Sequence, residues 1–193
     1  MPPTNPSTSA RPRRVAVLLA VLSLVLVACG GGEATEPAAA DAEDPPTDGG
    51  EVIEVVLRDF AFDGLPATVA AGTRFTVVNE AEAELHELVA FRLPDDEDRS
   101  VEELTTLSPP ELVAALGEPA AVLLATPGGP TIPAVGDGTL TEPGRYAIMC
   151  FIPTGADPQE YLDVAAETED GPPQVDGGPP HFVHGMYAEL TVE

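Results

Sequence analysis

Cys150 and the three histidines are the side chains of this 193-residue sequence best suited to chemistry. Cys150 ends the apolar segment GRYAIMC, and His86 lies in the earlier segment AELHELVAF. His181, His184 and Met186 follow together in PPHFVHGMYAELTV, near the end of the chain. A thiolate and two imidazoles with a weak thioether ligand form a trigonal site that suits copper and permits one-electron transfer. The residue types therefore indicate a metal site, provided that the fold brings them together.

The elements that must position these residues are predicted to be mostly strands. Runs rich in β-branched and aromatic residues, separated by Gly, Pro and Asp turn signals, are typical of strands. The predicted strands cover 51–62, 65–69, 73–79, 85–93, 122–125, 138–141, 144–152 and 186–192. Seven or so short strands of this kind predict an all-β protein, an antiparallel β-sandwich. The candidate ligands then lie at strand ends.

Short helices are predicted as insertions between the strands, at about 100–117 and 157–168. Ser100 and Ser108 are each followed three residues later by Glu, which fits a capping box. Asp157 precedes Pro158 and an apolar run, which is a similar start signal. Residues 171–180, GPPQVDGGPP, hold seven Gly or Pro in ten positions and are predicted to be loop.

The first 28 residues resemble a bacterial lipoprotein signal peptide. Three arginines precede a run of 14 residues at 15–28 that is apolar apart from Ser23, whereas a spanning helix needs about 20. Leu26-Val27-Ala28-Cys29 at the end of this run resembles a lipobox. The resemblance implies cleavage before Cys29 and lipid on its sulfur and amine. It therefore implies anchoring to the cell membrane at its extracytoplasmic face. An ordinary signal peptide with a chance cysteine is the alternative.

The acidic composition of the chain argues against nucleic acid as a partner and marks a linker after the apolar run. The 33 acidic residues against 8 arginines, with no lysine, give a net charge of −25. Phosphate binding needs clustered cations, so nucleic acid is not an expected partner. Residues 29–50 follow the apolar run and are small, acidic and rich in Pro and Gly, which predicts a disordered linker. The folded domain is expected over 51–193.

Cys150 has no partner for a disulfide within the chain if Cys29 carries lipid. A lone thiol in an oxidising compartment is an inert core thiol, an intermolecular disulfide, a nucleophile or a metal ligand. Alternation puts Tyr146, Ile148 and Cys150 on one strand face, which also suits a core cysteine. The His and Met residues near the chain end favour the ligand. A hydrolase is disfavoured because no oxyanion-hole motif or orienting Asn is evident.

In the order of these elements the domain resembles the cupredoxins, the plastocyanin and azurin type of blue copper protein. That family has an early His on a strand, then G-x-Y near the start of the penultimate strand and Cys at its end. His and Met come in the loop leading to the final strand. The corresponding residues here are His86, Gly144-Arg145-Tyr146, Cys150, His181 and Met186. The resemblance covers about residues 51–193.

The resemblance implies a cupredoxin-like, antiparallel Greek-key β-sandwich that holds one copper ion in a type 1 site. His86, Cys150 and His181 are the expected ligands and Met186 the axial ligand. His184 is a possible alternative ligand, and His181 or His184 is the expected exposed edge for electron exit. The implied function is a membrane-anchored one-electron carrier rather than an enzyme. Its expected partners are a redox protein or a copper donor.

Two departures from the family pattern leave other functions open. Thirty residues separate Cys150 from His181, where the family has only a few. Glu87 follows the early ligand, where the family often has an Asn that ties the two ligand loops. A copper chaperone or buffer using the same ligands is one alternative. A metal-free, cupredoxin-like module that binds a protein partner is the other.

Overall fold

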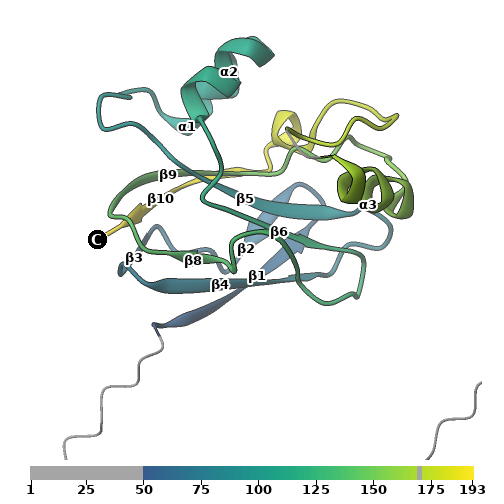
Figure 1. Cartoon of the computed structure of the whole chain (residues 1–193), viewed down its shortest axis with the longest axis horizontal. Helices are drawn as coiled ribbons and strands as arrows, with labels where there is room; N and C mark the ends of the chain where they lie inside the picture. Colours follow the sequence, from purple (N-terminus) through teal and green to yellow (C-terminus); the bar gives the residue numbers. More distant parts are fainter. Residues whose placement is uncertain (1–49, 169–170) are drawn as a thin grey trace, which may run out of the picture. The chain divides into compact units, whose positions relative to one another are not determined.

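Two β-sheets pack face to face in the computed structural model, which describes residues 50–168 and 171–193. One sheet has the order β2-β1-β4-β8, and the other has the order β3-β10-β9-β5-β6-β7. Figure 1 shows the two sheets as stacked layers, with helices α1 and α2 above the larger sheet. The predicted all-β sandwich with short helical insertions is confirmed.

The bounds of the elements follow chain order. The strands of the smaller sheet are β1 (Val52–Arg58), β2 (Ala61–Asp63), β4 (Thr73–Asn79) and β8 (Thr139–Leu140). The strands of the larger sheet are β3 (Thr68–Val69), β5 (His86–Arg92), β6 (Ala121–Ala125), β7 (Ile132–Val135), β9 (Gly144–Met149) and β10 (Tyr187–Val192). The helices are α1 (Val101–Leu104), α2 (Pro109–Leu116), α3 (Pro158–Glu167) and the 3₁₀ turn η1 (His181–His184).

The sheets are mixed, which corrects the prediction of a purely antiparallel sandwich. β1 pairs with β4 in parallel, and β3 pairs with β10 in parallel, whereas the other pairs are antiparallel. A parallel pair needs a crossover connection. The chain supplies one by leaving the smaller sheet after β2, contributing β3 to the larger sheet, and returning as β4.

One predicted strand is also wrong, because 51–62 contains two strands rather than one. A turn at Asp59 and Phe60 separates β1 from β2, which then pair antiparallel. Phe60 has φ 61°, a left-handed backbone conformation that is unusual for a bulky residue. Alternation of residue types continues through this turn, so the pattern alone gave no sign of it. β7 was not predicted either.

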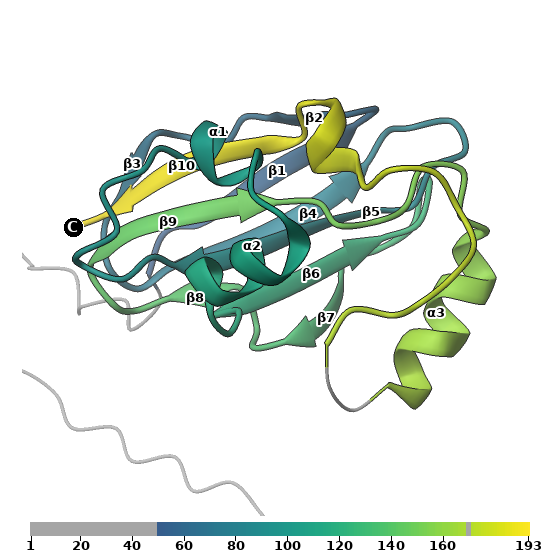
Figure 2. The ribbon, with the colours of Figure 1, turned by 90° about the horizontal axis from the view of Figure 1, so that it is seen from above.

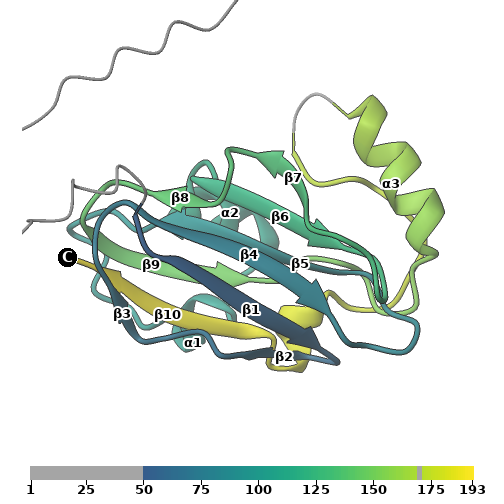
Figure 3. The same ribbon diagram turned by 90° about the horizontal axis from the view of Figure 1, so that it is seen from below.

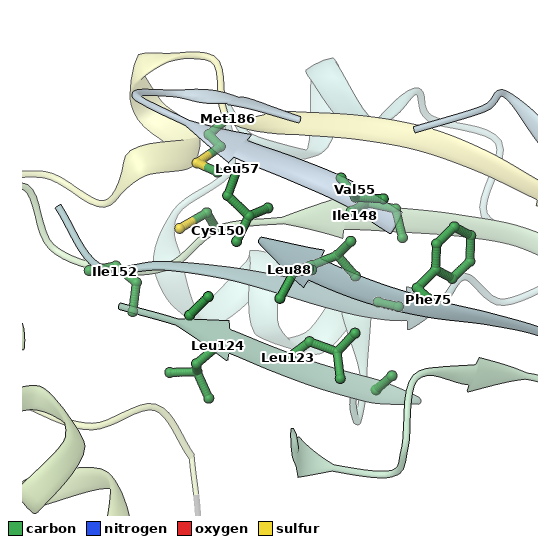
Figure 4. Close-up of a cluster of buried hydrophobic side chains, with 14 of the residues drawn as sticks. Val55, Leu57, Phe75, Leu88, Leu123, Leu124, Ile148, Cys150, Ile152 and Met186 are labelled. Atoms are coloured by element: carbon green, nitrogen blue, oxygen red, sulfur yellow. The ribbon is translucent and has the colours of Figure 1, made fainter. Parts of the chain in front are cut away.

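Two apolar clusters support the larger sheet, one on each face. The inner core lies between the sheets and includes Leu57 and Phe75 from the smaller sheet with Leu88, Leu123 and Ile148 from the larger one (Figure 4). The outer cluster includes side chains of α1 and α2 and of β5 and β9, and the view from above shows these helices lying over that face of the sheet (Figure 2). Both faces of β5 are therefore buried, which makes it a rigid element on which to mount a ligand.

The outer cluster explains why α1 and α2 form where the capping signals placed them. Ser100 and Ser108 both have the reciprocal capping box with the Glu three residues later. Val101, Leu104, Leu112 and Leu116 are buried against the sheet, together with Met149 of β9. Burial of these side chains holds two short helices that would be marginal alone.

The view from below shows the smaller sheet in front, with α3 lying beyond the ends of β5 and β6 (Figure 3). The signal peptide predicted at 1–28, the acylated Cys29 and nearly all of the linker predicted at 29–50 lie outside the described residues. Within the described part of the chain, no helix is both long and apolar enough to cross a membrane.

Candidate metal centre

Three strand ends meet at the candidate site. β9 runs antiparallel to both β5 and β10, so its carboxyl end lies beside the amino ends of those strands. His86 is the first residue of β5, and Cys150 directly follows β9. His181 begins η1, the turn that leads into β10. The topology of the larger sheet thus brings together residues that are far apart in the sequence.

His86, Cys150 and His181 form one tight cluster, with their ligand atoms all within 4.8 Å of one another. The two imidazole Nδ1 atoms are 3.0 Å apart, and the Cys150 Sγ lies 3.3 Å from the His181 Nδ1. All three residues have no exposed surface. Two imidazole nitrogens and a sulfur therefore converge on one point in a site that excludes water.

Met186 lies beside this cluster. The Cys150 N–H donates to the Met186 carbonyl at 3.2 Å, and the Met186 N–H donates to the His181 carbonyl at 3.2 Å. Continuing the register of β9 and β10 places Cys150 opposite Met186, with both side chains on the inner face. Figure 4 shows the two sulfur atoms directed to the same side. Met186 as an axial ligand stays a prediction.

The long insertion between Cys150 and His181 is closed at its base by a short backbone ladder. Pro153 and Pro180 form an antiparallel bridge. The His181 N–H donates to the Ile152 carbonyl at 3.0 Å, and the Thr154 N–H donates to the Pro179 carbonyl at 3.1 Å. The insertion carries α3 away from the site and returns to the same edge. Its length adds little to the cost of closing the loop, because that cost grows slowly with loop length.

Glu87 links the two ligand segments, although the cupredoxin family often has an Asn at this position for that role. Its side chain points to the face opposite His86 and is 4% exposed. The Phe151 N–H donates to the Glu87 Oε1 at 3.0 Å. One hydrogen bond thus links the neighbour of His86 to the neighbour of Cys150. Burial raises the pKa of Glu87 to about 7, although the Phe151 N–H lowers it in part.

Three residues at the site were not identified from the sequence: Asp59, Phe60 and Glu84. The Phe60 ring packs edge-on to His181, with centroids 5.1 Å apart, and tilts against His184 at 4.9 Å. The Asp59 carboxylate lies 3.6 Å from the His86 Nε2, and the Glu84 carboxylate lies 3.5 Å from the His181 Nε2. Asp59 and Phe60 occupy the turn hidden within the predicted single strand.

Two residues were expected as the exposed edge of the site, His181 or His184. His181 is fully buried behind Phe60. His184 is exposed, as expected for a residue at the outer edge. Met149, the residue before Cys150, belongs to the outer cluster on the opposite face of the sheet.

Burial sets the protonation of the cluster in the metal-free protein. It lowers the pKa of His181 to about 4, aided by the neighbouring His86, and it also lowers the pKa of His86. Burial raises the pKa of the Cys150 thiol, and the Glu87 charge adds to this effect. At neutral pH the imidazoles are neutral and the thiol is protonated. A reactive nucleophile needs an accessible thiol of low pKa, so the geometry does not support the hydrolase alternative.

The donor set fits a soft transition metal. Two neutral imidazoles and one thiol that can become a thiolate, with a thioether nearby, match the ligands of trigonal copper sites. The His86 Nε2 and the His181 Nε2 are buried and have no hydrogen-bond partner among the described residues. Each ring thus turns its Nδ1 toward the other ligands and leaves its Nε2 facing a carboxylate. That arrangement is typical of metal-binding histidines.

The two-sheet sandwich and its His-Cys-His cluster agree with the fold and the ligand set that the resemblance to cupredoxins implied. No protein-family model and no curated protein matches the chain. Among solved structures, the reduced auracyanin of the photosynthetic bacterium Roseiflexus castenholzii is 22% identical, with a TM-score of 0.41 over 75% of this chain and 98% of that one. Auracyanin A, a "blue" copper protein from Chloroflexus aurantiacus, is 17% identical, with a TM-score of 0.39 over 75% and 100%. Auracyanin B is 17% identical, with a TM-score of 0.34 over 74% and 88%.

Proposed function

We propose that this chain is a one-electron carrier with one copper ion in a type 1 site. His86, Cys150 and His181 are the ligands in this proposal, and Met186 is the weak axial ligand. The observation that carries it is the convergence of two imidazole Nδ1 atoms and one thiol in a fully buried cluster. Bound copper would supply reversible uptake and release of one electron. No substrate is turned over, so the chain is not an enzyme in this proposal.

The residues of the chain supply the rigid surroundings that fast electron transfer needs. His86 is mounted on a strand buried on both faces, and Cys150 and Met186 are linked by a backbone hydrogen bond. Asn79 holds the loop before His86, because its side-chain amide donates to the carbonyls of Glu84 and Ala125, both at 2.8 Å. Ligands held in this way change little in position between two oxidation states.

The closed site favours a carrier over the chaperone alternative. Reversible transfer of copper to another protein needs ligands that solvent and a partner can reach, whereas all three ligands here are buried. An electron needs no such opening. The exposed His184 lies against Phe60, and Phe60 lies against His181, so contacting rings lead from the buried ligand to the surface. We propose that electrons leave the protein along this path.

The same proposal includes an anchor and a partner. The lipobox-like Leu26-Val27-Ala28-Cys29 supports lipid attachment at Cys29 and location on the extracytoplasmic face of the cell membrane. A net charge of −25 supports a redox partner with a basic surface, because opposite charges steer association. Copper itself would come from a donor protein.

Cu(II) titration of the full chain tests this function by visible spectroscopy. We expect an intense thiolate-to-copper band that saturates at one ion per chain and is absent from Cys150→Ala. His181→Ala should also lose the band, whereas His184→Ala, a change of the same residue type at an exposed position, should keep it. No band in the parent protein, or a band that survives in Cys150→Ala, would contradict the proposal. The search for function would then turn to protein partners.

A further inference from the structure

Both ligand imidazoles have a second ring nitrogen, and these nitrogens share an unusual environment. The His86 Nε2 and the His181 Nε2 are buried and form no hydrogen bond within the described residues. The nearest charged group to each is a carboxylate, at 3.6 Å for Asp59 and 3.5 Å for Glu84. Buried N–H groups without an acceptor are rare in native proteins, because each keeps the full cost of its lost hydration. Both rings thus have the same kind of acceptor just beyond hydrogen-bonding distance.

The two carboxylates are available for this role. Arg58, the cation nearest to Asp59 in sequence, is already paired with Asp63 and Glu80, each at 2.6 Å. Among the described residues, neither Asp59 nor Glu84 forms an ion pair with an arginine. A metal bound at Nδ1 fixes the remaining proton of a neutral imidazole on Nε2, which then must donate. Only a small approach would make each contact a hydrogen bond.

The backbone holds the Glu84 carboxylate directly, and a backbone turn places Asp59 beside the cluster. Both oxygens of Glu84 accept from the Gly155 N–H, at 3.2 and 3.1 Å, which links the loop before His86 to the segment after Cys150. Asp59 precedes Phe60, whose left-handed backbone turns the chain toward the cluster. Strained residues of this kind often occur at functional sites.

We infer that Asp59 and Glu84 are positioning residues. When copper occupies the site, Asp59 accepts a hydrogen bond from the His86 Nε2–H group, and Glu84 accepts one from the His181 Nε2–H group. This inference rests on the proposed copper site. The carboxylates would fix the tautomer and the orientation of each ring and make the imidazoles better donors. Their negative charges favour Cu(II) over Cu(I), so they lower the reduction potential.

The test compares Asp59→Asn and Glu84→Gln with charge-matched controls in the full chain. Glu54→Gln removes one negative charge from an exposed side chain of β1, the strand that precedes Asp59, and Glu82→Gln removes one near Glu84 from an exposed side chain. Competition with chelators gives the affinities for Cu(II) and Cu(I), and a redox titration gives the potential. Loss of such outer-shell carboxylates typically costs about 10- to 100-fold in metal affinity.

We expect this loss for Cu(II) in Asp59→Asn and Glu84→Gln, a smaller loss for Cu(I), and a higher potential. Each tenfold difference between the two losses corresponds to about 59 mV. The controls should change the potential far less.

Equal changes in variants and controls, or affinities within twofold of the parent, would overturn the inference. Failure of the parent to form a copper–thiolate band would instead overturn the proposed function, so the two failures are distinguishable. Thermal unfolding of the metal-free variants separates these results from misfolding.

Discussion

Burial acts in opposite directions on the ligand residues of the site. It lowers the pKa of His181 to about 4 and lowers that of His86, which keeps both imidazoles neutral and able to bind a metal. It raises the pKa of the Cys150 thiol, which keeps the sulfur protonated until a metal replaces the proton. The three ligand side chains are therefore uncharged at neutral pH in the metal-free protein, and this explains how three polar groups remain buried together.

These protonation states predict about one proton released for each copper ion bound near pH 7. The proton comes from Cys150, because the pKa values of both imidazoles lie below this pH. Calorimetric titrations in buffers of different ionisation enthalpy measure the number. Cys150→Ala should release none from this position. A value near zero for the parent protein would mean that the thiol is not a ligand or is already ionised.

At the scale of elements, the base of the insertion decides where His181 lies. The ladder between 152–154 and 178–181 needs close backbone approach, with Gly178 at its end and Gly177 directly before it. A Cβ added at Gly177 would lie 2.5 Å from the Pro153 Cβ, which is far too close. A Cβ at Gly178 would lie 3.3 Å from the Thr154 Cβ, which a small shift relieves.

Gly177→Ala should therefore destabilise the metal-free protein by about 1–3 kcal/mol, the usual cost of overpacking. It should also weaken copper binding, because the ladder holds the His181 backbone in place. Denaturant unfolding and chelator competition measure the two effects. Gly178→Ala is the matched control and should show clearly smaller changes in both. Equal behaviour of the two variants would mean that the ladder does not position His181.

For the whole molecule, the candidate metal site adds a link between three strand ends that otherwise meet only through the hydrogen bonds of the larger sheet. The candidate ligands come from β5, from the end of β9 and from the segment before β10, and the site lies at one end of the inner core. A ligand that binds only the folded state stabilises it by mass action. Copper should thus act as a cross-link between three chain segments.

At free copper a hundredfold above its dissociation constant, the folded state should gain about 2.7 kcal/mol. A domain of this size should then unfold roughly 5–11 °C higher with copper than after chelation. Differential scanning calorimetry measures the shift, and His181→Ala should abolish most of it. No shift in the parent protein would argue against a preformed copper site.

The sequence by itself was enough to predict the sandwich and the capped helices, and its resemblance to the cupredoxins was enough to predict the cluster of His86, Cys150 and His181. Strand alternation, turn residues and capping boxes are local signals, and strand ends in neighbouring antiparallel strands must meet at one edge. Only the tertiary structure decided the parallel pairs, the burial of His181 behind Phe60, the tie through Glu87 and the return of the insertion. It also placed Asp59 and Glu84 beside the ligand rings. Each of these depends on contacts between residues distant in sequence or on a left-handed turn at Phe60, and a local pattern contains neither.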